Sequence, residues 1–262
     1  MIYALSPEGR AQLDAIAGTG TLLAFDIDGT LAPIVERPDD ARLPDDVQRC
    51  LADLARRHDV AIITGRAVAD ARRMLLFEPR YLIGNHGAEG LPGWHARSNG
   101  YARTVRRWRE ALTRSQGLRV AGVSIEDKTY SMSLHFRRAA DRAAAQRAIE
   151  QAVGTLRPSP RAIAGKAVVN LLAADAPDKG DALRALIGTT QPTGVLYVGD
   201  DDTDETVFAL DLPGVLSVRV EPGGNTAAAL FLREQREVLT LIQSLAREAA
   251  PHLASSHECR SP

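Results

Sequence analysis

Apolar and polar positions follow two different periods along the chain, and the first half shows short apolar runs separated by helical spacing. Three of these runs have the length of buried strands: Leu22–Phe25, Val60–Ile63 and Tyr81–Ile83. After Pro44, apolar residues recur at the 3.6-residue spacing of a helix, and a second helix is expected to run through Leu76. Short buried strands separated by helices are typical of a parallel, doubly wound sheet.

The middle of the chain has a period of two. Between Ser131 and Arg137, polar and apolar side chains alternate, which predicts a strand with one buried and one polar face. An alanine-rich helix is expected over residues 139–153 and a further strand over residues 164–172. A hairpin-and-helix block between two α/β halves indicates a second, α+β domain, which we place at residues 96–176.

The α/β pattern returns after Pro177. We expect a helix over residues 179–187, strands over 194–198 and 215–220, and a last helix over 234–249. The predicted fold class is therefore α/β, with a Rossmann-like parallel-sheet core formed by residues 1–95 and 177–262. The smaller α+β domain is inserted between these two halves.

Composition and charge narrow the range of partners. The 262 residues carry a formal net charge of −1 and are 45% hydrophobic, as in an ordinary soluble globular protein. Nothing in the overall charge attracts nucleic acid, and no apolar run approaches the roughly 20 residues that cross a bilayer. The start of the chain lacks the features of a secretory signal, and the two cysteines, Cys50 and Cys259, suggest neither disulfides nor a zinc site. We expect a cytoplasmic monomer.

Lysine is rare in this chain. Of the 32 basic residues, only three are lysines: Lys128, Lys166 and Lys179. A GC-rich genome explains the bias, because arginine then replaces lysine wherever charge alone matters. A lysine that remains is a candidate for chemistry that a planar guanidinium cannot perform, since its compact ammonium carries three donors.

Polar residues gather where the predicted parallel strands end, which is where ligands bind in such sheets. These residues are Asp26, Asp28, Thr64, His86, Asp200 and Asp201. Side chains two apart on a strand share a face, so Asp26 and Asp28 are expected to point into the same space. A divalent cation relieves their repulsion, and Mg²⁺ prefers one or two carboxylates together with waters and a substrate phosphate.

This set of residues suits phosphoryl transfer. Asp26 can supply the oxygen nucleophile that attacks phosphorus. Asp28 can protonate the leaving oxygen and later deprotonate the attacking water. Thr64 offers a hydroxyl, and Lys179 places a positive charge at the start of a helix, where anions bind well.

Each motif has a simpler explanation when it is taken alone. Asp-Gly-Thr after a strand is often only a turn, and the acidic run from Asp200 to Glu205 is often a solvated loop. The acidic run also imitates a calcium loop, but Glu205 stands where the tight turn of such a loop needs glycine. The functional interpretation depends on all the motifs occurring in order, each at a strand end.

The motifs resemble those of the haloacid dehalogenase superfamily of phosphatases. Asp26-Ile27-Asp28-Gly29-Thr30 is similar to its first motif, Asp-x-Asp-x-Thr, and Thr64, Lys179 and Asp200-Asp201 are similar to the second, third and fourth. The resemblance implies that Asp26 is the nucleophile and Asp28 the general acid and base. It also implies Mg²⁺ ligands: the Asp26 carboxylate, the Asp28 main-chain carbonyl and Asp200, with Asp201 or Asp204 in support.

Longer blocks resemble the trehalose-6-phosphate phosphatase family from about residue 20 to residue 230. They include Thr64-Gly65-Arg66, Gly84 to Glu89, Glu126-Asp127-Lys128, His135-Phe136-Arg137, Gly165-Lys166 and Asp178-Lys179-Gly180. All three lysines fall within these blocks. The resemblance implies a Mg²⁺-dependent phosphoric monoester hydrolase that converts trehalose 6-phosphate to trehalose and phosphate. It also implies that the inserted domain is a cap that closes over the active site and recognises the sugar.

The resemblance assigns substrate contacts to Gly65, Arg66, His86, Glu126, Lys128, His135, Arg137, Lys166 and Asn170. Asn170 stands where the family has a glutamate that contacts the sugar. Strand alternation places it on one face with Lys166, but a neutral amide binds hydroxyls more weakly than a carboxylate. Simpler roles remain open for three of these positions. His135 and Arg137 can belong, with Ser131 and Ser133, to a solvated sheet face, and His86 can be an orienting core residue.

Three alternatives to trehalose 6-phosphate hydrolysis stay open. The same chemistry can act on another phosphorylated sugar or glycoside, such as sucrose phosphate or a mannosyl- or glucosyl-glycerate phosphate. A non-catalytic sugar-phosphate sensor is a second alternative, although a sensor has no need of the nucleophile Asp26. A response-regulator receiver is the third, but it normally lacks an equivalent of Asp28 and has no use for an inserted cap.

Overall fold

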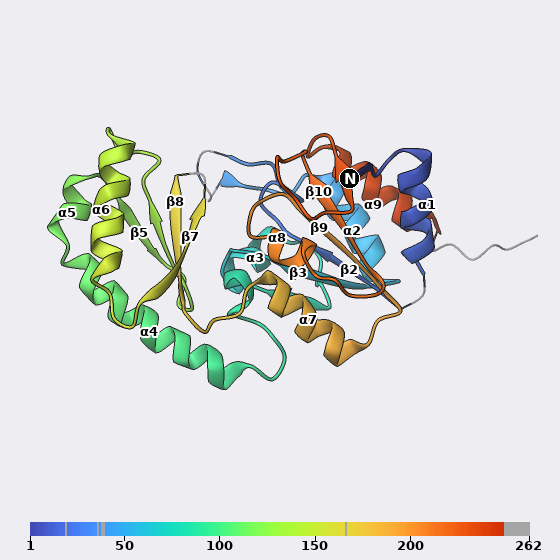
Figure 1. Ribbon diagram of the computed structural model, residues 1–262. Helices are drawn as coiled ribbons and strands as arrows, with labels where there is room; N and C mark the ends of the chain where they lie inside the picture. Colours follow the sequence, from blue (N-terminus) through green and yellow to red (C-terminus); the bar gives the residue numbers. More distant parts are fainter. Residues whose placement is uncertain (19, 36, 38–39, 166, 249–262) are drawn as a thin grey trace, which may run out of the picture.

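The computed structural model describes residues 1–248, apart from 19, 36, 38–39 and 166, and these residues form two separate sheets (Figure 1). The larger sheet is parallel throughout, with the strand order β1-β11-β10-β9-β2-β3-β4. Its strands are β1 (Ile2–Tyr3), β2 (Thr21–Phe25), β3 (Asp59–Ile63), β4 (Tyr81–Ile83), β9 (Gly194–Gly199), β10 (Val215–Val220) and β11 (Leu230–Leu232). The predicted parallel α/β core is thereby confirmed.

Helices cover both faces of the parallel sheet. They are α1 (Pro7–Ile16), α2 (Asp45–Ala55), α3 (Val68–Met74), α7 (Lys179–Thr190), α8 (Glu205–Phe208) and α9 (Glu237–Glu248). Leu23 and Phe25 of β2 pack on the side of α1, α2 and α9, whereas Leu22 and Ala24 pack on the side of α7 and α8. Because successive side chains of a strand point to opposite faces, a strand buried on both sides is apolar at every position.

The elements from α4 to β8 form a smaller unit with its own core, which we call the inserted unit; the remainder is the core unit. The helices of the inserted unit are α4 (His95–Thr113), α5 (Gln116–Val120) and α6 (Arg142–Gly154). Its strands are β5 (Ser124–Asp127), β6 (Met132–His135), β7 (Pro160–Gly165) and β8 (Val168–Ala173). These strands form an antiparallel sheet in the order β5-β6-β8-β7. Trp108 of α4 is fully buried in this core, and its ring nitrogen donates to Pro158 O at 2.8 Å.

Two expectations about the inserted unit are wrong. The single strand predicted over residues 164–172 is an antiparallel pair, because β7 ends at Gly165 and β8 begins at Val168, next to Ala167 with its left-handed φ of 64°. The inference that Lys166 and Asn170 share one face assumed a continuous strand, so it is wrong. Lys166 lies outside the described residues. Helix α4 was not predicted at all.

The polar face of β6 is not solvated. Ser131, just before the strand, and Ser133 within it are 1% and 0% exposed, so the solvated-face interpretation is wrong for both. His135 and Arg137 are half-buried. Hydrogen bonds from Ser131 to Asn85, and from Arg137 Nη1 to Val35 O at 2.9 Å, join this side of the inserted unit to the core unit.

In the part of the chain that the structure describes, no helix has both the length and the apolar character that a bilayer crossing requires.

The central strand β9 gives a test of the packing. We expect Leu196→Ala to lower the free energy of unfolding by about 2–5 kcal/mol, because Leu196 is fully buried and its removal leaves a cavity. Leu76→Ala is the matched control, since Leu76 is 78% exposed and its loss should change stability by no more than about 0.5 kcal/mol. Urea unfolding of both variants checks this, and equal effects would contradict the assigned core.

Candidate active site

The carboxyl ends of β2, β3 and β9 bring together residues that are far apart in the sequence. Asp26 follows β2, Thr64 follows β3 and Asp200 follows β9, while Lys179 begins α7. Strand β2 pairs with both β3 and β9, so the three strand ends are neighbours at one edge of the sheet. The parallel sheet therefore brings together the strand-end residues that the motif order singled out.

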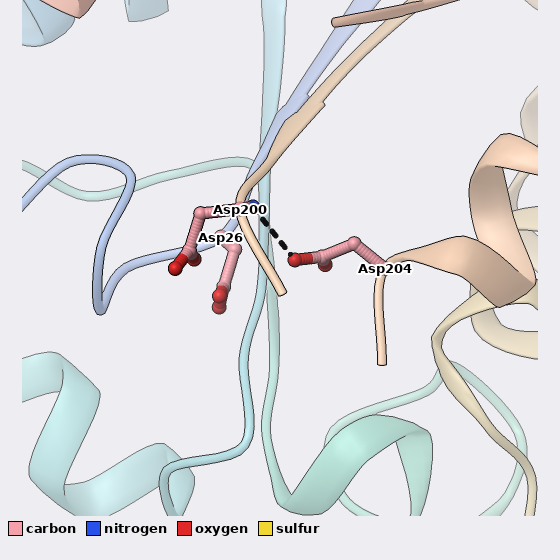
Figure 2. Close-up of side chains that lie close together, drawn as sticks. All are labelled: Asp26, Asp200 and Asp204. Carbon is pink, nitrogen blue, oxygen red and sulfur yellow. Dashed lines mark hydrogen bonds between the residues drawn. The ribbon is translucent and has the colours of Figure 1, made fainter. Parts of the chain in front are cut away.

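Three carboxylates lie close together at this edge. One carboxylate oxygen from each of Asp26, Asp200 and Asp204 lies within 4.8 Å of the other two, and Figure 2 shows the three side chains close together. Such a group of carboxylates repels itself unless positive charge is nearby. The oxygen donor set is the kind that hard divalent cations prefer, so this group could hold a metal ion.

Lys179 supplies positive charge at the centre of the group. Its ammonium lies 3.1 Å from Asp26 Oδ2 and 2.8 Å from Asp204 Oδ1, and the side chain is only 1% exposed. Burial alone would lower the pKa of Lys179, but Asp204 and Asp26 outweigh it and raise the pKa well above its ordinary value. The ammonium therefore stays charged at neutral pH and cannot be replaced by a neutral group without leaving buried carboxylates unpaired.

Asp26 retains one oxygen that the protein leaves unsatisfied. Its Oδ1 is buried and accepts no hydrogen bond from the described residues, while Oδ2 faces Lys179. Burial raises the pKa of Asp26 well above its ordinary value. A buried carboxylate oxygen without a donor is costly, and a cation or an incoming ligand would relieve that cost. Asp26 therefore has capacity left for a partner that the described residues do not supply.

Asp204 organises the loop after β9. Its Oδ2 accepts from the main-chain N–H groups of Asp200 and Asp201 at 2.9 and 3.0 Å. Its Oδ1 accepts from Lys179 and, at 2.5 Å, from the hydroxyl of Tyr197. With four donors around it, Asp204 has little capacity left to act as a metal ligand. Its main role in this structure is to hold Lys179 and to aim the loop that carries Asp200.

Two predicted metal-site residues have carboxylates outside the close group. Asp201 Oδ1 turns back to its own loop and accepts from Thr203 N and Oγ1 at 2.8 and 2.6 Å. Both carboxylate oxygens of Asp28 accept from Arg66, through Nε and Nη2, each at 2.6 Å. This bidentate pair fixes the orientation of Asp28 beside the site.

Gly29 permits the approach of Asp200. Its φ is +84°, and a Cβ at this position would lie 2.0 Å from Asp200 Oδ2. Only glycine adopts this left-handed backbone readily and also leaves the space that the Asp200 carboxylate occupies. The glycine inside the Asp-x-Asp-x-Thr motif is therefore needed for the carboxylate cluster, in addition to its role in the turn.

Thr64, Gly65 and His86 form one wall of the site, next to the carboxylates and just after β3 and β4. Thr64 is fully buried, and its Oγ1 accepts from Arg66 N at 3.3 Å. A Cβ on Gly65 would lie 2.5 Å from His86 Cε1, so the imidazole packs directly on this glycine. Burial, with the charges of Lys179 and Lys128, lowers the pKa of His86 to about 3, and the ring is neutral at physiological pH.

Several candidate residues of the inserted unit face this wall. Lys128 Nζ reaches Gly65 O at 3.2 Å and lies 3.9 Å from Glu126 Oε2. Glu126 Oε2 also lies 2.7 Å from His135 Nε2. Burial opposes ionisation of Glu126, but His135 and Lys128 outweigh it and lower its pKa. Burial lowers the pKa of Lys128.

The remaining candidate residues are spread over the inserted unit. Asn170 Oδ1 accepts from Ser133 Oγ at 2.6 Å, so its acceptor oxygen is committed inside the sheet. Arg137 reaches the core unit at Val35, and Lys166 lies outside the described residues.

The sequence interpretation missed several polar residues that hold the site. Asn85, Glu89 and Tyr197 are bonded into the site walls but were not singled out, and Asp204 was only a supporting ligand. Asn85 and Glu89 lie in the block Gly84 to Glu89, which was noticed as a motif. Asn85 contacts Lys128, 43 positions away, and Glu89 contacts Val68, 21 positions away, and no local pattern reveals such pairs.

The class of fold follows from this geometry: a haloacid dehalogenase-type α/β core, with acidic residues at its strand ends and an inserted α+β unit. The sequence matches the trehalose-phosphatase family over residues 24–221. The chain belongs to the trehalose-phosphatase family.

Two curated relatives show how far the sequence similarity extends. The chain is 32% identical over 223 residues to the trehalose-phosphate phosphatase of Mycobacterium marinum, covering 80% of this chain and 57% of that protein. It is 34% identical over 238 residues to an uncharacterized glycosyl hydrolase of Mycobacterium tuberculosis, covering 84% of this chain and 18% of that protein. The chain thus spans less than two thirds of the length of these relatives.

Solved structures show the same architecture. The C-terminal domain of trehalose-6-phosphate phosphatase from Candida albicans superposes with a TM-score of 0.72 at 24% identity, covering 94% of this chain and 98% of that one. A trehalose-6-phosphate phosphatase from Aspergillus fumigatus superposes with a TM-score of 0.58 at 29% identity, covering 94% and 99% of the two chains.

The neutral, buried His86 predicts a pH effect on stability. Its pKa of about 3 in the folded protein lies below the ordinary value of about 6.5, so the unfolded chain binds more protons between these values. The contribution of His86 to stability is full above pH 6.5 and falls as the pH drops, by at most about 1.4 kcal/mol per pH unit. His86→Asn should flatten the wild-type loss of stability between pH 6.5 and 5.

The exposed His95 supplies the control for this measurement. His95→Asn should leave the slope of unfolding free energy against pH at the wild-type value. Because only slopes are compared, a general loss of stability in either variant does not affect the result. A wild-type slope in His86→Asn would show that His86 is not held neutral by the fold.

Proposed function

We propose that this chain is a Mg²⁺-dependent phosphatase that hydrolyses trehalose 6-phosphate to trehalose and phosphate through a phosphorylated Asp26. The observation that carries the proposal is the buried, unsatisfied Oδ1 of Asp26 beside the Lys179 ammonium. An oxygen that is desolvated, held in place and free of donors is suited to attack an electrophile. Membership of the trehalose-phosphatase family supports the reaction type.

The proposed reaction has two steps at the same phosphorus. In the first, a bond forms between Asp26 Oδ1 and phosphorus while the bond from phosphorus to the sugar oxygen breaks. The sugar oxygen takes its proton from Asp28 and leaves as a hydroxyl. In the second, water attacks the phosphorus, gives its proton to Asp28 and releases phosphate from Asp26. Because both Asp28 oxygens accept from Arg66, the bond to the oxygen that carries the proton weakens when Asp28 is protonated.

Positive charge and donors would stabilise the transferring phosphoryl group. Lys179 offers its ammonium, and Thr64 offers a hydroxyl at the end of β3. When bound, Mg²⁺ would neutralise charge on the phosphate oxygens. We propose the Asp26 carboxylate, the Asp28 main-chain carbonyl and Asp200 as its ligands, with Asp201 in support. Asp204, with its oxygens already committed, would hold the loop.

The inserted unit would act as the cap, with proposed boundaries at residues 96–176, and would recognise the sugar. The proposed sugar contacts in the cap are Glu126, Lys128, His135 and Arg137. Those in the core unit are Gly65, Arg66 and His86. We add Lys166 and Asn170 from the family resemblance. From the sequence we further propose that the protein works as a monomer in the cytoplasm.

A second substrate remains a candidate because of Asn170. Its carbonyl oxygen is occupied by Ser133, so it offers a sugar chiefly its amide hydrogens, where the family has a carboxylate. An amide in place of the carboxylate favours a substrate rich in hydrogen-bond acceptors, such as the glycerate carboxylate of a mannosyl- or glucosyl-glycerate phosphate. Phosphate release from a panel of sugar phosphates, sucrose phosphate included, separates these substrates.

The nucleophile gives the first test of function. With Mg²⁺ and trehalose 6-phosphate, we expect Asp26→Asn to lower phosphate release by at least about 10³-fold, because the amide cannot attack phosphorus. Asp14→Asn, an exposed acid-to-amide change on α1, should retain wild-type activity. Wild-type turnover by Asp26→Asn would rule out the covalent route, and an inactive wild type toward every sugar phosphate would favour the sensor.

The metal site gives a test that does not depend on turnover. At 100 times its dissociation constant, Mg²⁺ should stabilise the wild type by about 2.7 kcal/mol and raise Tm by roughly 5–10 °C. Asp200→Asn should lose most of this shift because it removes a carboxylate from the cluster. Asp202→Asn, an exposed change in the same loop, should retain it. Equal shifts in all three proteins would exclude Asp200 as a ligand.

A further inference from the structure

Asn85 stands out among the buried polar residues because the proposed chemistry does not use it. It follows β4, is fully buried, and has a left-handed backbone with φ of 52°, as does its neighbour His86 with φ of 57°. Two consecutive non-glycine residues with positive φ are uncommon and persist only where surrounding contacts hold them.

The side-chain amide of Asn85 bridges the two units. Within the core unit, Nδ2 donates to Glu89 Oε2 at 2.7 Å. Toward the inserted unit, Nδ2 donates to Lys128 O at 3.3 Å, and Oδ1 accepts from the hydroxyl of Ser131. Both amide hydrogens and one oxygen lone pair are therefore in use, and two of the three partners belong to the inserted unit.

Glu89 fixes which way the amide points. Its Oε2 also accepts from Val68 N at 2.8 Å, so this carboxylate oxygen is anchored in the core unit. A reversed amide would place its oxygen against the Glu89 carboxylate and the Lys128 carbonyl, which are both acceptors. Only the observed orientation satisfies all three partners, and only an amide offers donors and an acceptor in this arrangement.

The bridge acts on the turn that carries Lys128. This turn joins β5 to β6 over residues 127–131, and Asn85 bonds to it on both sides, at Lys128 and at Ser131. With the turn held there, the Lys128 ammonium reaches Gly65 O at 3.2 Å, beside Thr64 at the end of β3. The Ser131 hydroxyl and the Lys128 carbonyl of the inserted unit thus both bind the side-chain amide of Asn85 in the core unit.

We propose that Asn85 is a positioning residue: it latches the 127–131 turn onto the core and so places Lys128 over the substrate site. The inference rests on the proposed function in that the substrate is a phosphorylated sugar. Asn85 itself makes no contact with the reacting atoms. Its role is to raise the fraction of molecules in which the inserted unit and the core form one site.

The test compares two substrates and two sides of the latch. In Asn85→Ala and in Ser131→Ala, kcat/KM for trehalose 6-phosphate should fall about tenfold, the effect of losing one or two hydrogen bonds across the interface. The kcat/KM for p-nitrophenyl phosphate, which has no sugar for the cap to hold, should change by less than about twofold. The double variant should be no worse than Asn85→Ala, because the two residues share one bond.

Hydrogen exchange reads the latch without any turnover. Amides of residues 127–131 should exchange faster in both single variants than in the wild type. Ser133→Ala is the matched control for exchange, since Ser133 is a buried serine of β6, two residues after Ser131, and its partner, Asn170, lies within the inserted unit. Its 127–131 amides should exchange at the wild-type rate. Ser131→Ala keeps the test valid if Asn85→Ala fails to fold.

The outcomes separate the latch from the proposed function. A wild type that hydrolyses p-nitrophenyl phosphate but no sugar phosphate would overturn the proposed substrate, while faster exchange in the variants would still support the latch. Unchanged exchange in Ser131→Ala and Asn85→Ala would overturn the latch, whatever the enzyme hydrolyses. Equal losses on both substrates in Asn85→Ala would also overturn it, because Asn85 would then act on the phosphate site.

Discussion

The structure of the site depends on one buried ammonium. Lys179 lies between Asp26 and Asp204, and without it these carboxylates would face each other in a region that water does not reach. The same ammonium leaves Asp26 with one satisfied oxygen and one orphaned oxygen. An arginine would not be equivalent, because its planar fork directs its donors differently from a compact ammonium.

The sequence predicted the core well because local pattern and global fold agree there. The strands β2, β3, β4 and β9 are buried on both faces, so each appears in the sequence as a continuous apolar run. The motifs could then be placed at the ends of these predicted strands. The inserted unit was predicted less well. Its helix α4 is rich in arginine, and its apolar stripe of Tyr101, Val105, Trp108 and Leu112 was overlooked.

Other parts of the site could not be predicted from local pattern. Ser133 is buried because the polar face of β6 turns inward, and alternation alone cannot distinguish that face from a solvated one. The roles of Asp204 and Asn85 depend on partners such as Lys179 and Lys128, 25 and 43 positions away. Side-chain pairing over such separations is set by topology, and no motif spacing encodes it.

The strand order has a consequence for synthesis of the chain. Strand β2 is synthesised before its partner β9 and the loop with Asp200, which are made about 170 residues later, after the whole inserted unit. Until then one side of β2 lacks its hydrogen-bonding neighbour, and the nucleophile lacks both Lys179 and the carboxylates around it. The nascent chain therefore carries an open, apolar strand edge while these residues are made, and such an edge favours aggregation.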